Sequence, residues 1–283
     1  MNVLSLFDGM SCGQIALERV GIDVDAYYAA EIDKYAIQIA KKNYPDTIHL
    51  GDVQDVHGSE LPKIDLLIGG SPCQGFSFAG KNLNFADQRS KLFFEYVRLL
   101  KECKPTYFML ENVMMKKESE EIITKMLGVE PIKINSHCFS AQNRNRLYWT
   151  NIPVDMNIDV SQDLLKHILE QHPKNFVIMS ESFVKRNWDH CLIDYNKPKA
   201  ACLSATEYVK NGRQGDYLRC DFFGTPKLDG ELHRKLTPIE CERLQTVPDN
   251  YTEGVSNTQR YKMLGNGWTV DVIAHIFKGM LQD

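Results

Sequence analysis

A short apolar run that ends in glycines, with a proline and a cysteine directly after it, constrains this chain more than any other stretch. Residues 64–68 are typical of a buried strand, and Gly-Gly-Ser-Pro-Cys-Gln-Gly-Phe-Ser follows at 69–77. Cys73 is therefore predicted on a loop just past the carboxyl end of a strand, where open α/β sheets bind ligands. Pro72 stiffens the approach to it, and the glycines allow close backbone contacts. A buried structural cysteine is the alternative, but proline, glutamine and glycines are poor core material.

The N-terminal stretch has the same order of strand, turn and helix. Residues 3–7 are apolar, residues 8–13 contain two glycines, and a helical pattern of apolar residues follows. Such a corner can bind a nucleotide-like ligand with its backbone N–H groups. Gly9 and Gly13 do not complete a dinucleotide fingerprint, so an ordinary turn between strand and helix stays open as an alternative.

Acidic residues follow three further predicted strands. Glu31 comes after the strand 25–30, about twenty residues beyond the glycine turn, a position that suits hydrogen bonds to ribose hydroxyls. Asp52 follows a short third strand, where it could accept a hydrogen bond from the amine of adenine or occupy a solvated turn. Glu111 follows the strand 107–110. Asp33 is expected to cap the helix 34–43.

Two other segments could serve a site at this edge of the sheet. Residues 76–89 are polar and long for a loop, which indicates a lid or binding loop. A helix is predicted at 90–101, with its aromatic residues in the core. Arg144 and Arg146 precede an apolar strand at 147–150, and their spacing puts both guanidinium groups on one face of an extended chain. Unpaired surface arginines are the alternative.

Length, charge and cysteine usage narrow the class of protein. A chain of 283 residues suits one domain with a smaller companion. The eight cysteines show neither metal-ligand spacing nor the density of a disulfide scaffold, so we expect a reducing cytoplasm and no metal. The net charge of −4 argues against general coating of nucleic acid but permits a local basic cleft. No apolar stretch suits a bilayer span and no signal peptide is evident, so we expect no membrane association.

Taken together, these motifs resemble those of the cytosine-C5 DNA methyltransferase family, in the family's order and over nearly the whole chain. Each match is weak alone, and the ordered set is specific. Residues 7–9 and 268–270 look similar to the animal de novo members, whereas 74–77 resembles the bacterial and phage members. Gly267 departs from the pattern, because many bacterial relatives have serine there and only a backbone contact would be kept. The matching segments are 6–9 with Gly13, 31–33, 51–53, 70–75, 111–113, 142–146, 236–245 and 265–267.

The resemblance implies an α/β fold. We expect a Rossmann-like S-adenosylmethionine-dependent methyltransferase sheet with helices on both faces, plus a small, irregular, β-rich target-recognition domain. Residues 1–153 and 234–283 would form the catalytic and cofactor-binding domain, and 154–233 the target-recognition domain. The segment 185–227 contains eight basic and five acidic residues. This excess of positive charge is compatible with phosphate contacts and base reading, and equally with an ordinary solvated insertion.

The sequence after this segment returns to helical patterns. Thr237, Pro238 and Glu240 form a helix start, with a capping side chain, a proline in the first turn and a glutamate three residues on. Further helices are predicted at 257–264 and 270–280.

The resemblance also implies a mechanism. The thiolate of Cys73 would add to C6 of cytosine and make C5 able to take the methyl group of S-adenosylmethionine, leaving S-adenosylhomocysteine. Protonated Glu111 would hold N3 and the amino group, Arg146 would hold O2, and the base would first leave the duplex. The remaining expected residues are Arg144 as a brace, Phe7, Gly9, Met10, Ser11, Glu31, Ile32, Asp52, Pro72, Leu92, Asn266 and Trp268 for the cofactor, and Gln74, Ser77, Arg89, Lys210 and Arg213 for DNA.

The implied activity is that of a DNA (cytosine-5-)-methyltransferase acting on double-stranded DNA. We expect a monomer and leave a cognate restriction enzyme open as a partner. The same catalytic residues would serve a tRNA cytosine-C5 methyltransferase. A catalytically relict DNA-binding regulator is an alternative from another class, although the intact Cys73, Glu111 and Arg146 speak against it. A dinucleotide-dependent oxidoreductase is disfavoured by the glycine pattern.

Overall fold

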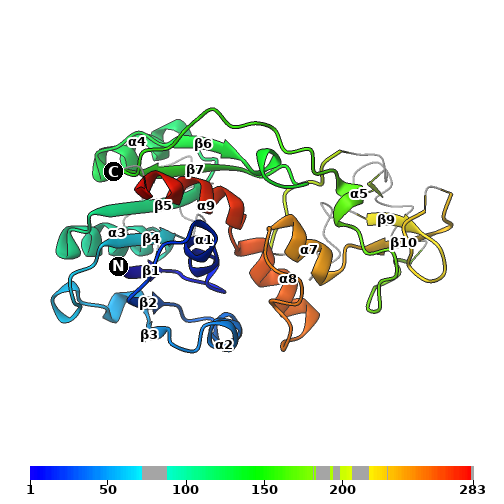
Figure 1. Cartoon of the computed structure of the whole chain (residues 1–283), viewed down its shortest axis with the longest axis horizontal. Helices are drawn as coiled ribbons and strands as arrows, with labels where there is room; N and C mark the ends of the chain where they lie inside the picture. Colours follow the sequence, from blue (N-terminus) through cyan, green and yellow to red (C-terminus); the bar gives the residue numbers. More distant parts are fainter. Residues whose placement is uncertain are drawn as a thin grey trace. The chain divides into compact units, whose positions relative to one another are not determined.

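The computed structural model describes residues 1–71, 88–180, 182, 192–193, 198–205, 217–227 and 229–281, with the backbone alone at 88–90 and 192–193. The chain divides into two compact units (Figure 1). Unit 1 holds Met1–Ile134, Asn145–Met156 and Ile273–Asp283, and unit 2 holds Asn135–Arg144 and Asn157–Val272. The expected target-recognition domain, 154–233, is a functional assignment, and it stays a prediction.

A seven-stranded sheet in the order β3-β2-β1-β4-β5-β7-β6 forms the centre of unit 1. Strand β1 pairs in parallel with β2 and β4, β2 with β3, and β4 with β5, whereas β7 runs antiparallel to β5. The strands are β1 (Asn2–Leu6), β2 (Ala26–Ala30), β3 (Ile48–Gly51), β4 (Leu66–Gly70), β5 (Tyr107–Val113), β6 (Ile132–Asn135) and β7 (Asn145–Thr150).

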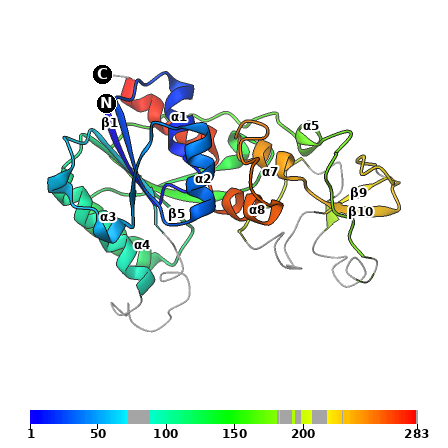
Figure 2. The same ribbon diagram turned by 90° about the horizontal axis from the view of Figure 1, so that it is seen from below.

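Helices cover both faces of this sheet (Figures 1 and 2). The chain steps from β1 to β3 in one direction and from β4 to β5 in the other, so right-handed crossovers put their helices on opposite faces. Side chains alternate along β1, where Leu4 and Leu6 join a core cluster with Phe93 and Tyr96. The helices with residues in unit 1 are α1 (Cys12–Val20), α2 (Lys34–Asn43), α3 (Gln88–Cys103), α4 (Lys117–Leu127) and α9 (Val270–Phe277).

Local signals explain several of these bounds. Asp33 accepts a hydrogen bond from the backbone N–H of Tyr35 at 3.0 Å and caps α2, as predicted. Gly21 ends α1 in the left-handed conformation, with φ of 70°. The helix predicted at 270–280 is α9 followed by a 3-10 turn at Lys278–Leu281. None of the helices in the described ranges is long and apolar enough to cross a membrane.

Strand β4 differs from the prediction in its position. It runs from Leu66 to Gly70, two residues later than the predicted 64–68, because Gly69 and Gly70 pair with β5. A Cβ at Gly69 would lie 3.1 Å from the carbonyl oxygen of Leu6 and from the ring of Tyr96, so glycine allows this close approach. Helix α3 begins at Gln88, so the last two residues of the predicted loop 76–89 belong to the helix.

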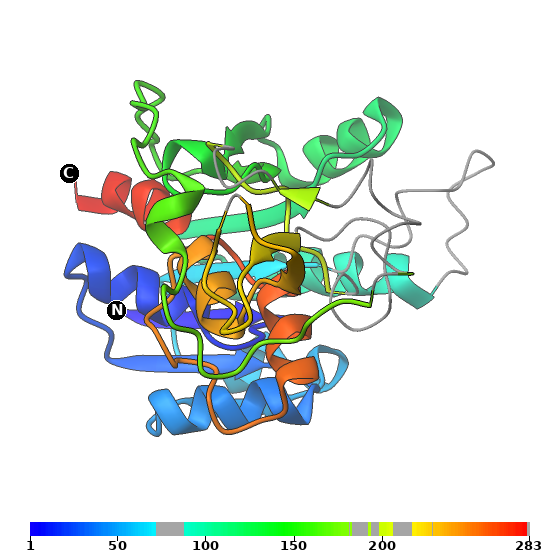
Figure 3. The same ribbon diagram turned by 90° about the vertical axis from the view of Figure 1, so that its right-hand side faces the viewer.

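Unit 2 contains a small three-stranded sheet in the order β10-β9-β8, with strands β8 (Leu192–Ile193), β9 (Tyr217–Cys220) and β10 (Leu232–Lys235). Its helices are α5 (Leu165–Ile168), α7 (Pro238–Leu244) and α8 (Asn257–Asn266), and α7 packs against α8, both in orange in Figure 3. Thr237 and Glu240 form the predicted capping box at the start of α7. Glu240 also pairs with Arg234 at 2.7 Å, and both side chains are fully buried.

The last turn of unit 1 gives a test of its packing. A Cβ built on Gly279 would lie 1.7 Å from the carbonyl oxygen of Pro153, so Gly279→Ala must displace the backbone. We expect Gly279→Ala to lower the free energy of unfolding by roughly 1–3 kcal/mol in urea denaturation. Lys278→Ala, at the exposed neighbouring position, should leave the transition unchanged. An unaltered midpoint in Gly279→Ala would contradict this packing.

Candidate active site

The parallel strands of unit 1 bring their carboxyl ends to one edge of the sheet. The strands that end there are β1 at Leu6, β2 at Ala30, β3 at Gly51, β4 at Gly70 and β5 at Val113. Strand order reverses between β1 and β4, and ligands of open α/β sheets bind at such a switch point. This edge is therefore where a ligand site is expected in unit 1.

The turn after β1 has an unusual backbone. Phe7, Gly9 and Ser11 all have positive φ, at 59°, 61° and 64°. Side-chain-bearing residues rarely adopt this conformation, and such strain gathers at ligand-binding sites. Three backbone N–H groups of this turn have partners within the protein: Asp8 donates to the carbonyl oxygen of Ala30, Gly9 to the carboxylate of Glu31, and Ser11 to the carbonyl oxygen of Asp8. Phe7 is half-buried and Met10 is buried, so the turn presents mostly backbone.

Glu31 fixes this turn to the end of β2. One carboxylate oxygen accepts a hydrogen bond from the backbone N–H of Gly9, and the other accepts from Ile32 and Asp33, each at 2.8 Å. Ile32, beside it, is 72% exposed. A polar acceptor and an exposed apolar side chain thus stand next to each other at this edge.

Asp52 and Leu92 have partners of their own. Asp52 accepts a hydrogen bond from the backbone N–H of Gln54 at 3.0 Å and caps the short 3-10 turn Val53–Asp55. Leu92, on α3, is partly buried and packs against the core cluster. The cofactor roles of Asp52 and Leu92 stay predictions.

Asp8, which sequence reasoning did not include among the site residues, lies inside the turn. Its carboxylate accepts hydrogen bonds from the hydroxyl of Ser11 and from that of Tyr27, the latter at 2.8 Å. Burial is the main reason that the pKa of Asp8 is raised to about 6. Its place within the motif segment 6–9 is the sequence signal that pointed to it.

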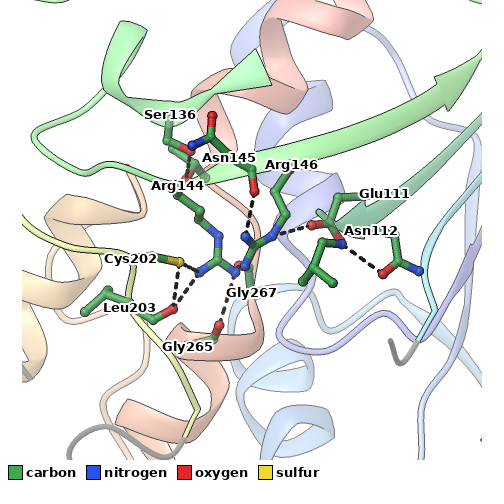
Figure 4. A network of polar contacts seen from close by, with 12 residues as sticks. Glu111, Asn112, Ser136, Arg144, Asn145, Arg146, Cys202, Leu203, Gly265 and Gly267 are labelled. Carbon is green, nitrogen blue, oxygen red and sulfur yellow. Dashed lines mark hydrogen bonds and ion pairs between the residues drawn. The ribbon is translucent and has the colours of Figure 1, made fainter. Parts of the chain in front are cut away.

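The end of β5 carries an ion pair. Nε of Arg146, on β7, lies 2.9 Å from Oε1 of Glu111, and both side chains are largely buried (Figure 4). Because β7 runs antiparallel to β5, Arg146 stands opposite Val113 and its side chain reaches Glu111 near the strand end. Charge-assisted contacts of this kind hold both groups in one orientation.

Asn112 connects Glu111 to the strand that leads to Cys73. Its amide donates to the carbonyl and hydroxyl oxygens of Ser71 at 3.3 and 3.2 Å, and its own oxygen accepts from the backbone N–H of Val113. Gly70, just before Ser71, is the register partner of Glu111. In the sequence, Asn112 belongs to the motif 111–113, which does not by itself predict this role.

Several predicted site residues lie outside the described part of the chain. These are Pro72, Cys73, Gln74, Ser77, Lys210 and Arg213, together with the side chain of Arg89. Among the described residues, no group of three or more His, Cys, Asp or Glu side chains could hold a metal ion.

Arg144 belongs to unit 2, although it is only two residues before Arg146. Its guanidinium donates to the carbonyl oxygens of Leu203 at 2.7 Å, Gly265 at 3.1 Å and Gly267 at 2.9 Å (Figure 4). Gly267 contacts Arg144 through its backbone carbonyl oxygen. The serine side chain that many bacterial relatives have at this position is therefore not needed for this contact. A Cβ on Gly265 would lie 2.3 Å from the backbone of Ser204, so glycine is required.

Two buried glutamines extend this network. Gln245 donates to Leu264 at 2.6 Å and accepts from Thr269 at 2.9 Å, while Gln142 accepts from the backbone of Leu203 at 2.8 Å. Both were quoted as motif residues without a role. Asn266 is exposed and Trp268 half-buried in the same unit.

The Arg144 network predicts a strict requirement for arginine. Lysine has one ammonium group and cannot reach three carbonyls in the planar fork of a guanidinium. We expect Arg144→Lys to destabilise unit 2 by roughly 2–3 kcal/mol, measured by denaturation and by hydrogen exchange of α8. Arg219→Lys, at the exposed position of β9 in the same unit, is the matched control and should change little. Equal stability of Arg144→Lys and the native protein would count against the network.

Comparisons with known proteins agree with the motifs. A family model described as C-5 cytosine-specific DNA methylase matches residues 1–189 and 177–282. The type II methyltransferase M1.ScrFI of Lactococcus lactis subsp. cremoris is 31% identical over 312 residues, 99% of this chain and 78% of that protein. The type II methyltransferase M.NlaX of Neisseria lactamica is 30% identical over 307 residues, with coverages of 99% and 96%.

A solved structure supports the fold. The S. pombe Dnmt2 methyltransferase matches with a TM-score of 0.81 and 20% identity, covering 99% of this chain and 98% of that one. Together with the sheet order, this likeness confirms the predicted Rossmann-like fold of S-adenosylmethionine-dependent methyltransferases. Because the family model spans nearly the whole sequence, the chain belongs to the family of C-5 cytosine-specific DNA methylases, as its motifs predicted.

Proposed function

We propose that this protein transfers a methyl group from S-adenosylmethionine to C5 of a flipped-out cytosine in a specific sequence of double-stranded DNA. The observation that carries the proposal is the Glu111–Arg146 pair at the end of β5. Glu111 is the register partner of Gly70, the last residue of β4. Cys73 follows Gly70 by three residues in the sequence. A carboxyl, a guanidinium and a cysteine close to one strand end are the groups that this chemistry needs.

The turn after β1 suits the cofactor. Its strained backbone, the carboxylate of Glu31 and the exposed side chain of Ile32 offer partners for the amino-acid part, the ribose and the adenine in turn. When bound, S-adenosylmethionine would supply an electrophilic methyl group. The residues proposed to hold it are Phe7, Gly9, Met10, Ser11, Glu31, Ile32, Asp52, Pro72, Leu92, Asn266 and Trp268.

Cys73 is the proposed nucleophile. Its thiolate forms a bond to C6, the C5–C6 double bond opens, and C5 becomes the carbon that takes the methyl group. Loss of the C5 proton to a base or a water then restores the double bond and expels the thiolate. The proton's acceptor is not assigned to any residue.

Glu111 and Arg146 are proposed to meet adjacent edges of the same pyrimidine. Glu111, protonated in the complex, donates to N3, and its other oxygen accepts from the amino group. Arg146 holds O2, toward which electron density moves as the thiolate adds. The two side chains stand 2.9 Å apart, so entry of the base would exchange their ion pair for contacts to N3, the amino group and O2.

Contacts to DNA are proposed at Gln74, Ser77, Arg89, Lys210 and Arg213. We propose a monomeric enzyme. The relatives named type II methyltransferases make a cognate restriction enzyme a partner to look for.

The nucleophile is tested with labelled S-adenosylmethionine and duplex DNA of mixed sequence. We expect Cys73→Ser to lower methyl transfer by roughly 10³-fold or more, and duplexes with 5-fluorocytosine to trap the native protein covalently but not the variant. Undiminished transfer by Cys73→Ser would refute the mechanism. Transfer to tRNA and not to DNA would favour the alternative substrate, and binding of DNA without transfer would favour a relict regulator.

The acid is tested separately. Glu111→Gln keeps the shape of the side chain but cannot deliver a proton, so we expect kcat to fall by about 10²–10⁴-fold. Affinity for S-adenosylmethionine, measured by calorimetry, should stay the same, because Glu111 is not among the proposed cofactor ligands. Glu118→Gln, an exposed residue in the first turn of α4, serves as the matched control. A normal kcat in Glu111→Gln would remove Glu111 from the mechanism.

A further inference from the structure

Asp8 is tied to its surroundings at four points. Its carboxylate accepts from the hydroxyls of Ser11 and Tyr27. Its backbone N–H donates to the carbonyl oxygen of Ala30 at 3.2 Å, and its own carbonyl oxygen accepts from the N–H of Ser11 at 3.1 Å. One residue thus connects the turn after β1 to β2 on one side and to the start of α1 on the other.

Ser11 shows that this arrangement serves the turn. Serine at the first position before a helix normally caps it by accepting a hydrogen bond from a backbone N–H of the first turn. Ser11 makes no such capping bond, has φ of 64°, and donates its hydroxyl to Asp8 instead. A strained conformation persists only when the surrounding contacts hold it, and Asp8 supplies those contacts between Phe7 and Ser11.

We propose that Asp8 is a positioning residue: its ionised carboxylate, held between Tyr27 and Ser11, keeps the turn in the shape that receives S-adenosylmethionine. This inference rests on the proposed function of the turn. It adds a residue that touches no part of the reaction and acts through Ser11 and the backbone of the turn.

The protonation state of Asp8 decides whether this anchor holds. A carboxylate accepts from both hydroxyls, whereas a neutral acid must use one oxygen as a donor, so one of the two bonds is weakened or rearranged. The pKa of Asp8 is raised to about 6, chiefly by burial, with a further rise from the charge of Glu31. The titratable groups that face this cluster are Tyr27, Glu31 and the buried Cys12. Tyr27 stays a neutral donor, because burial raises its pKa well above its usual value.

Two pH dependences of opposite sign follow. The raised pKa means that the folded protein holds this proton more tightly than the unfolded chain. The resulting stabilisation is complete below pH 3.8 and is lost as the pH rises through about 6. Affinity for the cofactor should run the other way and weaken as the pH falls below about 6, because the ionised form holds the turn.

The experiment is a calorimetric titration of S-adenosylmethionine and S-adenosylhomocysteine against pH, from one unit below to two units above the pKa of about 6. In the native protein, we expect both affinities to fall by up to tenfold for each pH unit below the midpoint. Asp8→Asn should bind both ligands roughly tenfold more weakly at neutral pH, a loss of about 1.4 kcal/mol, and should show no midpoint there. Any pH dependence of affinity that remains in Asp8→Asn reports titration of the ligand itself.

Tyr27→Phe gives a readout that a merely structural role would not produce. The hydroxyl of Tyr27 stabilises the ionised carboxylate, so its removal should shift the midpoint to higher pH while the carboxylate remains. Asp65→Asn is the matched control, because Asp65 accepts from the backbone N–H of Asn2 at the other end of β1. It should behave as the native protein does.

The outcomes separate this inference from the proposed function. Native affinity and an unchanged midpoint in Asp8→Asn would overturn the role of Asp8, even with full methyl transfer. If Asp8→Asn fails to fold, judged by circular dichroism, Tyr27→Phe decides, and an unshifted midpoint there overturns the inference. A native protein that binds neither ligand at any pH would instead refute the proposed cofactor site.

Discussion

Parallel pairing of β1, β4 and β5 is the constraint on which the rest of unit 1 depends. It brings the carboxyl ends of these strands to one edge, so the turn near residue 8, Ser71 and Glu111 lie along the same edge although they are far apart in sequence. A shift of one residue between β4 and β5 would turn every side chain of the shifted strand to the other face and would separate Gly70 from Glu111. The amide of Asn112, which donates to Ser71, helps to hold this register.

The residues of unit 2 show how motif positions can serve structure as much as chemistry. Among the described residues of that unit, the side chain of Arg144 donates to backbone carbonyl oxygens. The amide of Gln142 donates to a backbone carbonyl oxygen and to the side chain of Gln245. Such groups are costly to bury unless each one is satisfied, so this connected set favours a single arrangement of the segment around residue 203 and the end of α8 at residues 265–267. The arginine motif therefore has two halves, one in each unit, and only Arg146 pairs with the strand that carries Glu111.

Much of the fold was predictable because its signals are local. The capping residues Asp33 and Thr237 mark helix starts directly, and the apolar runs mark the strands. The bounds of β4 could not be predicted from local signals, because the pairing of Gly69 and Gly70 depends on β5, which lies some forty residues further along the chain. Glu31 could be singled out from its place after a strand, but the hydrogen bond that it accepts from Gly9 and the cluster of Asp8 with Tyr27 depend on how β1 and β2 pair.

The left-handed backbone of Phe7 has a consequence for attempts to make this protein more thermostable. Glycine at that position would relieve conformational strain of order 1 kcal/mol, and a search for stabilising substitutions would select it. The same change would delete an aromatic ring at the switch point of the sheet. If Phe7 contacts the cofactor as proposed, thermal stability and ligand binding compete at this one side chain, and stabilising substitutions are better sought on the exposed faces of the helices.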